Sequence, residues 1–216
     1  MNCDYSFFEE TLTKVRRLRT KFCFPFHILR GAVEASSPEQ LSVSPQVIWK
    51  SDTDEDEAII ETSNYAARGG TSLDRLRAFL GNELPNDFAK FYRHYAQALV
   101  VTRSFPIHLW DESKIVEEAE GWRLRKQRPI RFFRFGSYFD HPAQHFGLWQ
   151  EKLGSGVWRV VVTDVETNDD EYDSDTMDPI YILGPSFHEW LRKLVESDGV
   201  NDHFWCENGD TYLDPA

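Results

Sequence analysis

The chain has 216 residues, of which 41% are hydrophobic and 14% aromatic, and its formal charge is −12. This apolar content excludes an intrinsically disordered chain, and the negative charge disfavours direct binding to the phosphates of DNA or RNA. The three scattered cysteines form neither a disulfide framework nor a C-x-x-C metal site. There is no secretion signal, and no apolar run approaches the ~18 residues that span a bilayer. We therefore expect a cytoplasmic protein that does not bind membranes.

Residues 1–70 are predicted to form an N-terminal extension of unknown fold, with one helix and short strands. Residues 6–21 carry apolar side chains at helical spacing, and Ser6 and Glu9 are placed as a capping box. The opposite side of this helix is basic, with Lys14, Arg16, Arg17, Arg19 and Lys21. A basic amphipathic helix is typical of a membrane or nucleic-acid element. We favour the alternative, the solvated face of a helix docked on the protein.

Residues 71–197 show a sharper pattern of helices and strands. One short helix is predicted after Thr71 or Ser72, and a second begins at Leu84-Pro85. A third is capped by Asp111 and is predicted to end near Gly121. The strand-like runs are residues 98–102, 107–110, 130–135, 146–150, 157–165 and 179–183.

The last strand leads directly into the clearest helix of the chain. Ser186 stands as its N-cap, and Glu189 three residues later completes a capping box. The apolar side chains that follow recur at helical spacing, which predicts one stripe packed on the sheet. They are Phe187, Trp190, Leu191, Leu194 and Val195.

The order helix, helix, strands, helix, strands, helix predicts an α+β fold with a mostly antiparallel sheet covered by helices. It lacks the βα alternation of a parallel sheet. We expect three parts: the extension 1–70, an α+β domain 71–197, and an acidic C-terminal tail 198–216 that Phe204 and Trp205 pin to the body.

Several pieces of the predicted domain, taken in order, resemble the SUKH superfamily, the Smi/Knr-type domain. They are Leu84-Pro85-Asn86-Asp87-Phe88 through Tyr92, Ile107-His108-Leu109-Trp110 with the helix that follows, residues 130–135 and 146–151, and Pro179 through Leu191. The chain departs from the family at Ala96-Gln97-Ala98, where an Asn-Gly turn is common, and at residues 136–140, where a Gly-Asp loop is common. The resemblance implies a SUKH-like fold and a role either as a bacterial immunity protein or as a regulator of the cell-wall type.

One acidic segment is the best candidate for partner contact. Residues 164–178 hold eight acids and no base. An EF-hand loop would need a glycine at its sixth place and a glutamate at its twelfth, and both are missing. The segment is either a solvated loop or an electrostatic attractor for a basic partner. The candidate contact residues are Asp169, Asp170, Glu171, Asp173 and Asp175.

Two other groupings have a weaker basis. Asp140, His141 and His145 share one loop, but Pro142 interrupts the helical spacing of the histidines, so a polar loop is preferred to a metal site.

A basic cluster interleaved with Phe132, Phe133 and Phe135 is typical of an RNA platform, but we expect it to pair with the acidic segments instead. Its members are Arg123, Arg125, Lys126, Arg128, Arg131 and Arg134.

No nucleophile elbow, phosphate loop or dinucleotide fingerprint occurs, so the sequence predicts neither a catalytic residue nor a cofactor. The resemblance implies a non-enzymatic protein-binding module, and first an immunity protein that neutralises a basic, nuclease-type toxin by masking its active-site region. The alternatives are an intracellular scaffold or regulatory protein and, last, a metal enzyme built on Asp140, His141 and His145.

Overall fold

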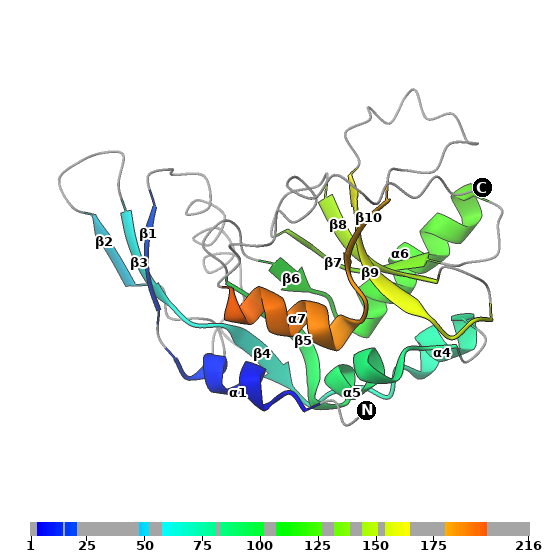
Figure 1. The fold of residues 1–216 in the computed structure, drawn as a ribbon, viewed down its shortest axis with the longest axis horizontal. Helices are drawn as coiled ribbons and strands as arrows, with labels where there is room; N and C mark the ends of the chain where they lie inside the picture. The colour runs from blue at the N-terminus through cyan, green and yellow to red at the C-terminus, as the bar shows by residue number, and fades with distance from the viewer. Residues whose placement is uncertain are drawn as a thin grey trace.

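A computed structural model describes residues 4–14, 16–20, 48–51, 58–80, 83–101, 107–126, 132–138, 144–150, 154–164 and 180–197. Within these residues the chain forms five helices, a seven-stranded sheet and a three-stranded sheet (Figure 1). The predicted α+β class is confirmed. None of the described helices combines the length and the apolar character that a membrane span requires.

The seven-stranded sheet is an antiparallel meander. Its strands lie side by side in the order in which they follow along the chain, and each printed pairing is antiparallel. They are β4 (Tyr65–Arg68), β5 (Tyr95–Val100), β6 (Ile107–Leu109), β7 (Phe132–Tyr138), β8 (Gln144–Gln150), β9 (Trp158–Asp164) and β10 (Ile180–Gly184). The predicted strands of residues 71–197 are therefore confirmed, within a few residues at their ends.

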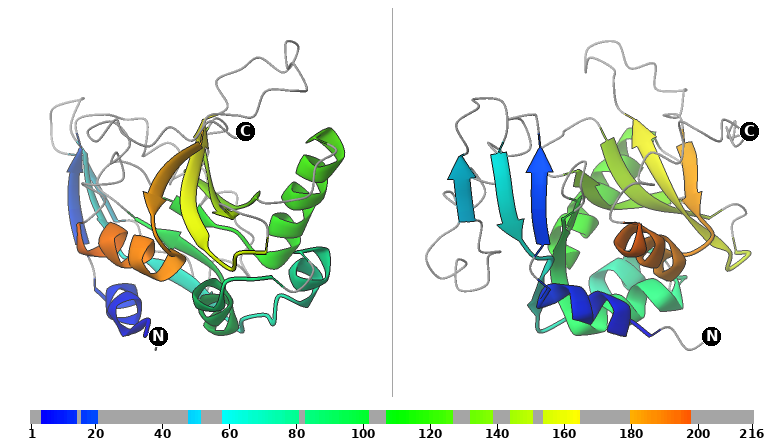
Figure 2. Two further views of the ribbon diagram at one scale, coloured as in Figure 1. Left: turned by 45° about the vertical axis from the view of Figure 1, so that its right-hand side comes forward. Right: turned by 60° about the vertical axis from the view of Figure 1, so that its left-hand side comes forward.

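A second sheet of three strands stands beside the first (Figure 2). It consists of β1 (Arg16–Thr20), β2 (Ile48–Ser51) and β3 (Ala58–Thr62), with β3 in the centre. The helix predicted over residues 6–21 is therefore wrong in its second half. Only α1 (Ser6–Leu12) is helical, because Arg16–Thr20 pairs in register with Ala58–Thr62. Pairing with a distant strand overrides the local helical pattern.

Four further helices connect or follow the strands of the meander. They are α4 (Asp74–Leu80), α5 (Asn86–His94), α6 (Glu112–Lys126) and α7 (Phe187–Glu196). The predicted end of the third helix near Gly121 is wrong, since α6 continues to Lys126. Glycine costs only about 1 kcal/mol inside a helix, so it ends one only when the backbone also turns there.

Most of the predicted helix starts are confirmed by their hydrogen bonds. The Ser186 hydroxyl accepts from Glu189 N–H at 3.3 Å, and Asp111 Oδ1 accepts from Lys114 N–H at 3.0 Å. The capping box at Ser6 is wrong: the N-cap of α1 is Tyr5, which makes no side-chain cap. Instead, Asp4 Oδ1 accepts from Ser6 N–H at 3.0 Å.

The main core lies between one face of the meander and the helices α5 and α7 (Figures 1 and 2). It is built from aromatic rings: Phe187 meets Phe88 at 5.1 Å and Phe135 at 5.3 Å, and Trp190 meets Phe146 at 5.4 Å. Aromatic pairs of this kind each contribute about 0.5–1.5 kcal/mol to the stability of the fold, beyond the burial of their area. The predicted apolar stripe of the last helix is confirmed, because Phe187, Trp190, Leu191 and Leu194 are all buried.

Candidate functional site

The acidic residues predicted to contact a partner lie outside the described residues. These are Asp169, Asp170, Glu171, Asp173 and Asp175. The strands on either side of them are described: β9 ends at Asp164, β10 begins at Ile180, and Thr163 pairs with Ile180. The two described strand ends that flank residues 165–179 are therefore neighbours in the sheet. Their role as partner contacts stays a prediction.

Of the three residues in the metal hypothesis, only His145 is described. It lies on β8, paired in register with Ser137, and its ring meets Trp110 edge-on at 5.6 Å. Burial, and then the nearby Arg134 charge, lower the pKa of His145 to about 4. Among the described residues no group of three or more His, Cys, Asp or Glu side chains could hold a metal ion. His145 is thus a neutral, largely buried ring at ordinary pH.

A chain of charged side chains lies next to His145. Lys114 Nζ is 2.9 Å from Glu118 Oε1, and Arg134 Nη1 is 3.8 Å from Glu118 Oε2. Burial acts to raise the pKa of Glu118, but the hydrogen bond and charge of Lys114, with the charge of Arg134, bring it below its usual value. The same carboxylate raises the pKa of Lys114. These ion pairs stabilise the packing of α6 on β7, so their role is structural.

The basic–aromatic cluster is only partly described. Arg134 pairs with Glu118 from α6, which belongs to neither acidic segment, so the expected pairing of this cluster with those segments stays a prediction. The three phenylalanines between the basic residues are almost wholly buried, with exposures of 2% for Phe132 and 0% for Phe133 and Phe135. Buried rings cannot stack on nucleic-acid bases, so these rings do not form an RNA platform.

The two sequence pieces that most resemble the SUKH family meet in space. The carboxylate of Asp87, from the start of α5, accepts a hydrogen bond from the backbone N–H of His188 at 3.0 Å. Beside this contact, the rings of Phe88 and Phe187 meet edge-on at 5.1 Å and 84°. Asp87 thus caps the first turn of α7, where unpaired N–H groups favour a negative charge.

The N-terminal helix adds contacts at this corner that sequence reasoning missed. Tyr5 Oη donates to the carbonyl of Asp87 at 2.8 Å, and the His188 ring Nε2 lies 2.9 Å from the carbonyl of Asp4. The Tyr5 ring also meets those of His188 and Phe91, at 5.1 and 5.4 Å. The only signal in the sequence is the aromatic trio Tyr5, Phe7 and Phe8, which does not reveal its partner.

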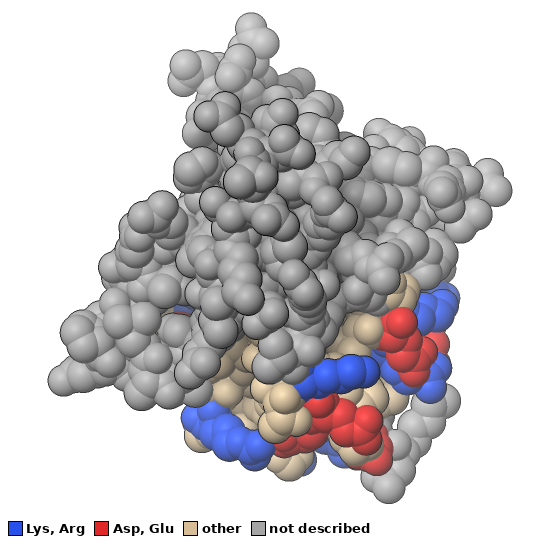
Figure 3. Space-filling model, turned by 90° about the vertical axis from the view of Figure 1, so that its left-hand side faces the viewer, with Lys and Arg blue, Asp and Glu red and all other residues tan. Residues whose placement is uncertain are grey.

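One face of the molecule carries charges of both signs over its described part. On the face shown in Figure 3, basic and acidic side chains are interspersed over the described part, with no broad field of one sign. The net charge of −12 is therefore not concentrated on the described part of this face. No protein-family model matches the chain, and no curated protein matches its sequence.

Proposed function

We propose that this chain is a non-enzymatic protein-binding module, and specifically an immunity protein of the SUKH type. It neutralises a toxin that acts on nucleic acid, by masking the active-site region of that toxin. In this proposal the acidic residues between β9 and β10 meet the basic substrate cleft of the toxin.

The observation that carries this proposal is the contact of Asp87 and Phe88 with His188 and Phe187. The two pieces lie about a hundred residues apart in the chain, and both belong to the set of segments that resemble the family. Their meeting supports the view that they belong to one structural signature. The meander with helices on one face is consistent with a SUKH-like domain.

The charge pattern supports a basic partner. Eight acids fall between Asp164 and Asp178 with no compensating base, and the chain as a whole carries −12. Toxins that cleave nucleic acid need a basic cleft for the phosphates. An acidic surface that faces such a cleft speeds association and fixes orientation more than it adds affinity.

A second candidate is an intracellular scaffold or regulatory protein that resembles the cell-wall regulator branch. The three-stranded sheet favours it, because this sheet is built wholly from residues 16–62 and offers a contact region separate from the meander. A toxin gene next to the gene of this chain favours immunity, and its absence favours regulation.

The test neutralises the five candidate acids together, with Asp to Asn and Glu to Gln at Asp169, Asp170, Glu171, Asp173 and Asp175. The matched control neutralises five acids that are exposed on the described surface: Glu10, Asp74, Glu117, Glu120 and Glu196. With the toxin domain encoded beside this chain, we expect the first variant to associate more slowly and with a shallower salt dependence than the control. Equal rates and slopes in the two variants would remove the acidic segment from the interface.

A further inference from the structure

Two connections of the chain join the small sheet to the rest of the fold, one to α1 and one to the meander. The chain leaves the main core after α1 to enter the small sheet at β1, and it returns from β3 to β4 through Ser63 and Asn64. Among the described elements, the three strands of the small sheet follow one another in the chain. We call these two connections, residues 13–15 and 63–64, the neck.

One buried side chain of the neck, that of Asn64, is hydrogen-bonded both to α1 and to the end of β5. Asn64 is 3% exposed, its Nδ2 donates to Thr11 Oγ1 at 2.9 Å, and its Oδ1 accepts from Val101 N–H at 2.8 Å. Thr11 lies on α1 and Val101 directly follows β5. The hydroxyl of Thr11 also donates to the carbonyl of Phe8 at 2.6 Å, so it is held in place to accept from Asn64.

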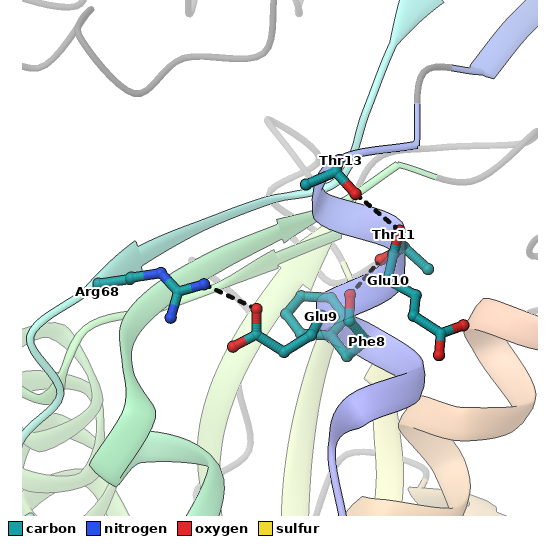
Figure 4. Close-up of polar contacts among 6 residues, drawn as sticks. All are labelled: Phe8, Glu9, Glu10, Thr11, Thr13 and Arg68. Carbon is teal, nitrogen blue, oxygen red and sulfur yellow. Dashed lines mark hydrogen bonds and ion pairs between the residues drawn. The ribbon is translucent and has the colours of Figure 1, made fainter.

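Further contacts hold α1 on the meander. The Glu9 carboxylate lies 2.8 Å from Arg68 Nη2 on β4 (Figure 4). Burial, and next a hydrogen bond to Glu9, raise the pKa of Tyr95 on β5. Phe8 is fully buried, and its ring meets Phe91 at 5.6 Å and Tyr95 at 5.4 Å.

We propose that α1 is a strap whose docking locks the neck through Thr11 and Asn64. When the strap is released, the small sheet opens as one unit while the meander stays folded. A small sheet becomes independently stable only through a hydrophobic face or through packing against a helix, so an anchor such as α1 stabilises it. This role of α1 concerns the free chain and is independent of the proposed function.

The direct test is hydrogen exchange of the full chain with Thr11→Val. Valine keeps the branched shape at the end of α1 but removes the acceptor of Asn64. The control is Thr13→Val, which removes a hydroxyl that donates to the carbonyl of Glu10 at 3.4 Å (Figure 4). Both variants keep the buried ring of Phe8, so both are expected to fold.

We expect Thr11→Val to raise the exchange rates of β1 and β3 about five- to tenfold, as one lost buried hydrogen bond implies. The exchange rates of β7 and β8 should be unchanged, and Thr13→Val should behave as the parent chain does.

A second pair of variants gives an independent test: Glu9→Gln should raise the exchange rates of β1 and β3 about twofold, and Glu10→Gln should not. Equal exchange of β1 and β3 in Thr11→Val and Thr13→Val would overturn the strap. An equal rise in β7 and β8 would overturn it too, because the loss would then be global.

Discussion

The carboxylate of Asp87 caps the helix that begins a hundred residues later, by accepting the backbone N–H of His188 at 3.0 Å. Asp87→Ala should lower the free energy of unfolding by about 1–2 kcal/mol, since it removes a charged acceptor from the first turn of α7. Asn86→Ala is the control, because Asn86 is exposed on the same turn of α5. Equal urea midpoints for the two variants would show that the Asp87 contact does not stabilise the fold.

Two serines that look alike in the sequence should differ in their effect on stability. Ser186→Ala should lower the free energy of unfolding by about 1 kcal/mol, because its hydroxyl accepts from Glu189 N–H. Ser6→Ala should change it by less than about 0.5 kcal/mol, since Ser6 lies inside α1 and is exposed. Chemical denaturation of both variants measures this difference, and a larger loss for Ser6→Ala would restore the capping box inferred from the sequence.

Two neighbouring phenylalanines test whether α1 belongs to the main core. Phe8 is fully buried, so Phe8→Ala should lower the free energy of unfolding by about 3–5 kcal/mol. Phe7 is only partly buried, where it meets Tyr5 and His188, so Phe7→Ala should cost less than about 2 kcal/mol. Thermal or urea unfolding of the two variants gives the comparison. A small loss for Phe8→Ala would mean that α1 is not part of the core.

The stability of the protein should fall in mild acid because of its buried histidines. Burial lowers the pKa of His145 from 6.5 to about 4, and it also lowers the pKa of His108. The unfolded chain therefore binds protons at these residues between pH 6.5 and 4 while the folded chain does not. Stability is complete above pH 6.5 and is lost as the pH falls toward 4.

The measurement is a series of urea titrations from pH 7 to 5. This range stays above the usual pKa of Glu118, whose pKa is lowered in the fold. His145→Gln should lose less stability over it than the parent chain does, with His108 supplying part of the remaining slope. His94→Gln is the control, because His94 is exposed. Parallel curves for His145→Gln and the parent chain would exclude this role of His145.

The elements whose signals are local were predictable from the sequence. The spacing of Phe187, Trp190 and Leu191 identified the buried stripe of α7, and the strand-like run of residues 157–165 identified β9. The mistakes occurred where a distant partner decides the structure. Arg16–Thr20 carries apolar residues at helical spacing with its neighbours, yet it pairs with Ala58–Thr62, about forty residues away. Nothing in the spacing of one segment reveals that pairing.

The same difference between local patterns and distant contacts applies to the candidate site. The preference for a polar loop over a metal site at Asp140, His141 and His145 stays a prediction, since only His145 lies among the described residues. The contacts of Tyr5 and Asp4 with α5 and α7 were not predictable, since they join residues far apart in the chain through backbone carbonyls. Every residue has a backbone carbonyl, so the residue type does not indicate which carbonyl accepts a hydrogen bond.

The central claim is that this chain neutralises a toxin by binding it. The most direct measurement asks whether a gene for a nucleic-acid-cleaving toxin adjoins that of this chain, and titrates the activity of its basic toxin domain with the full chain at low and high salt. We predict that activity falls to zero near an equimolar ratio, with inhibition that sets in more slowly at high salt. Full activity in the presence of excess chain, under conditions where the toxin is folded and active, would contradict the account.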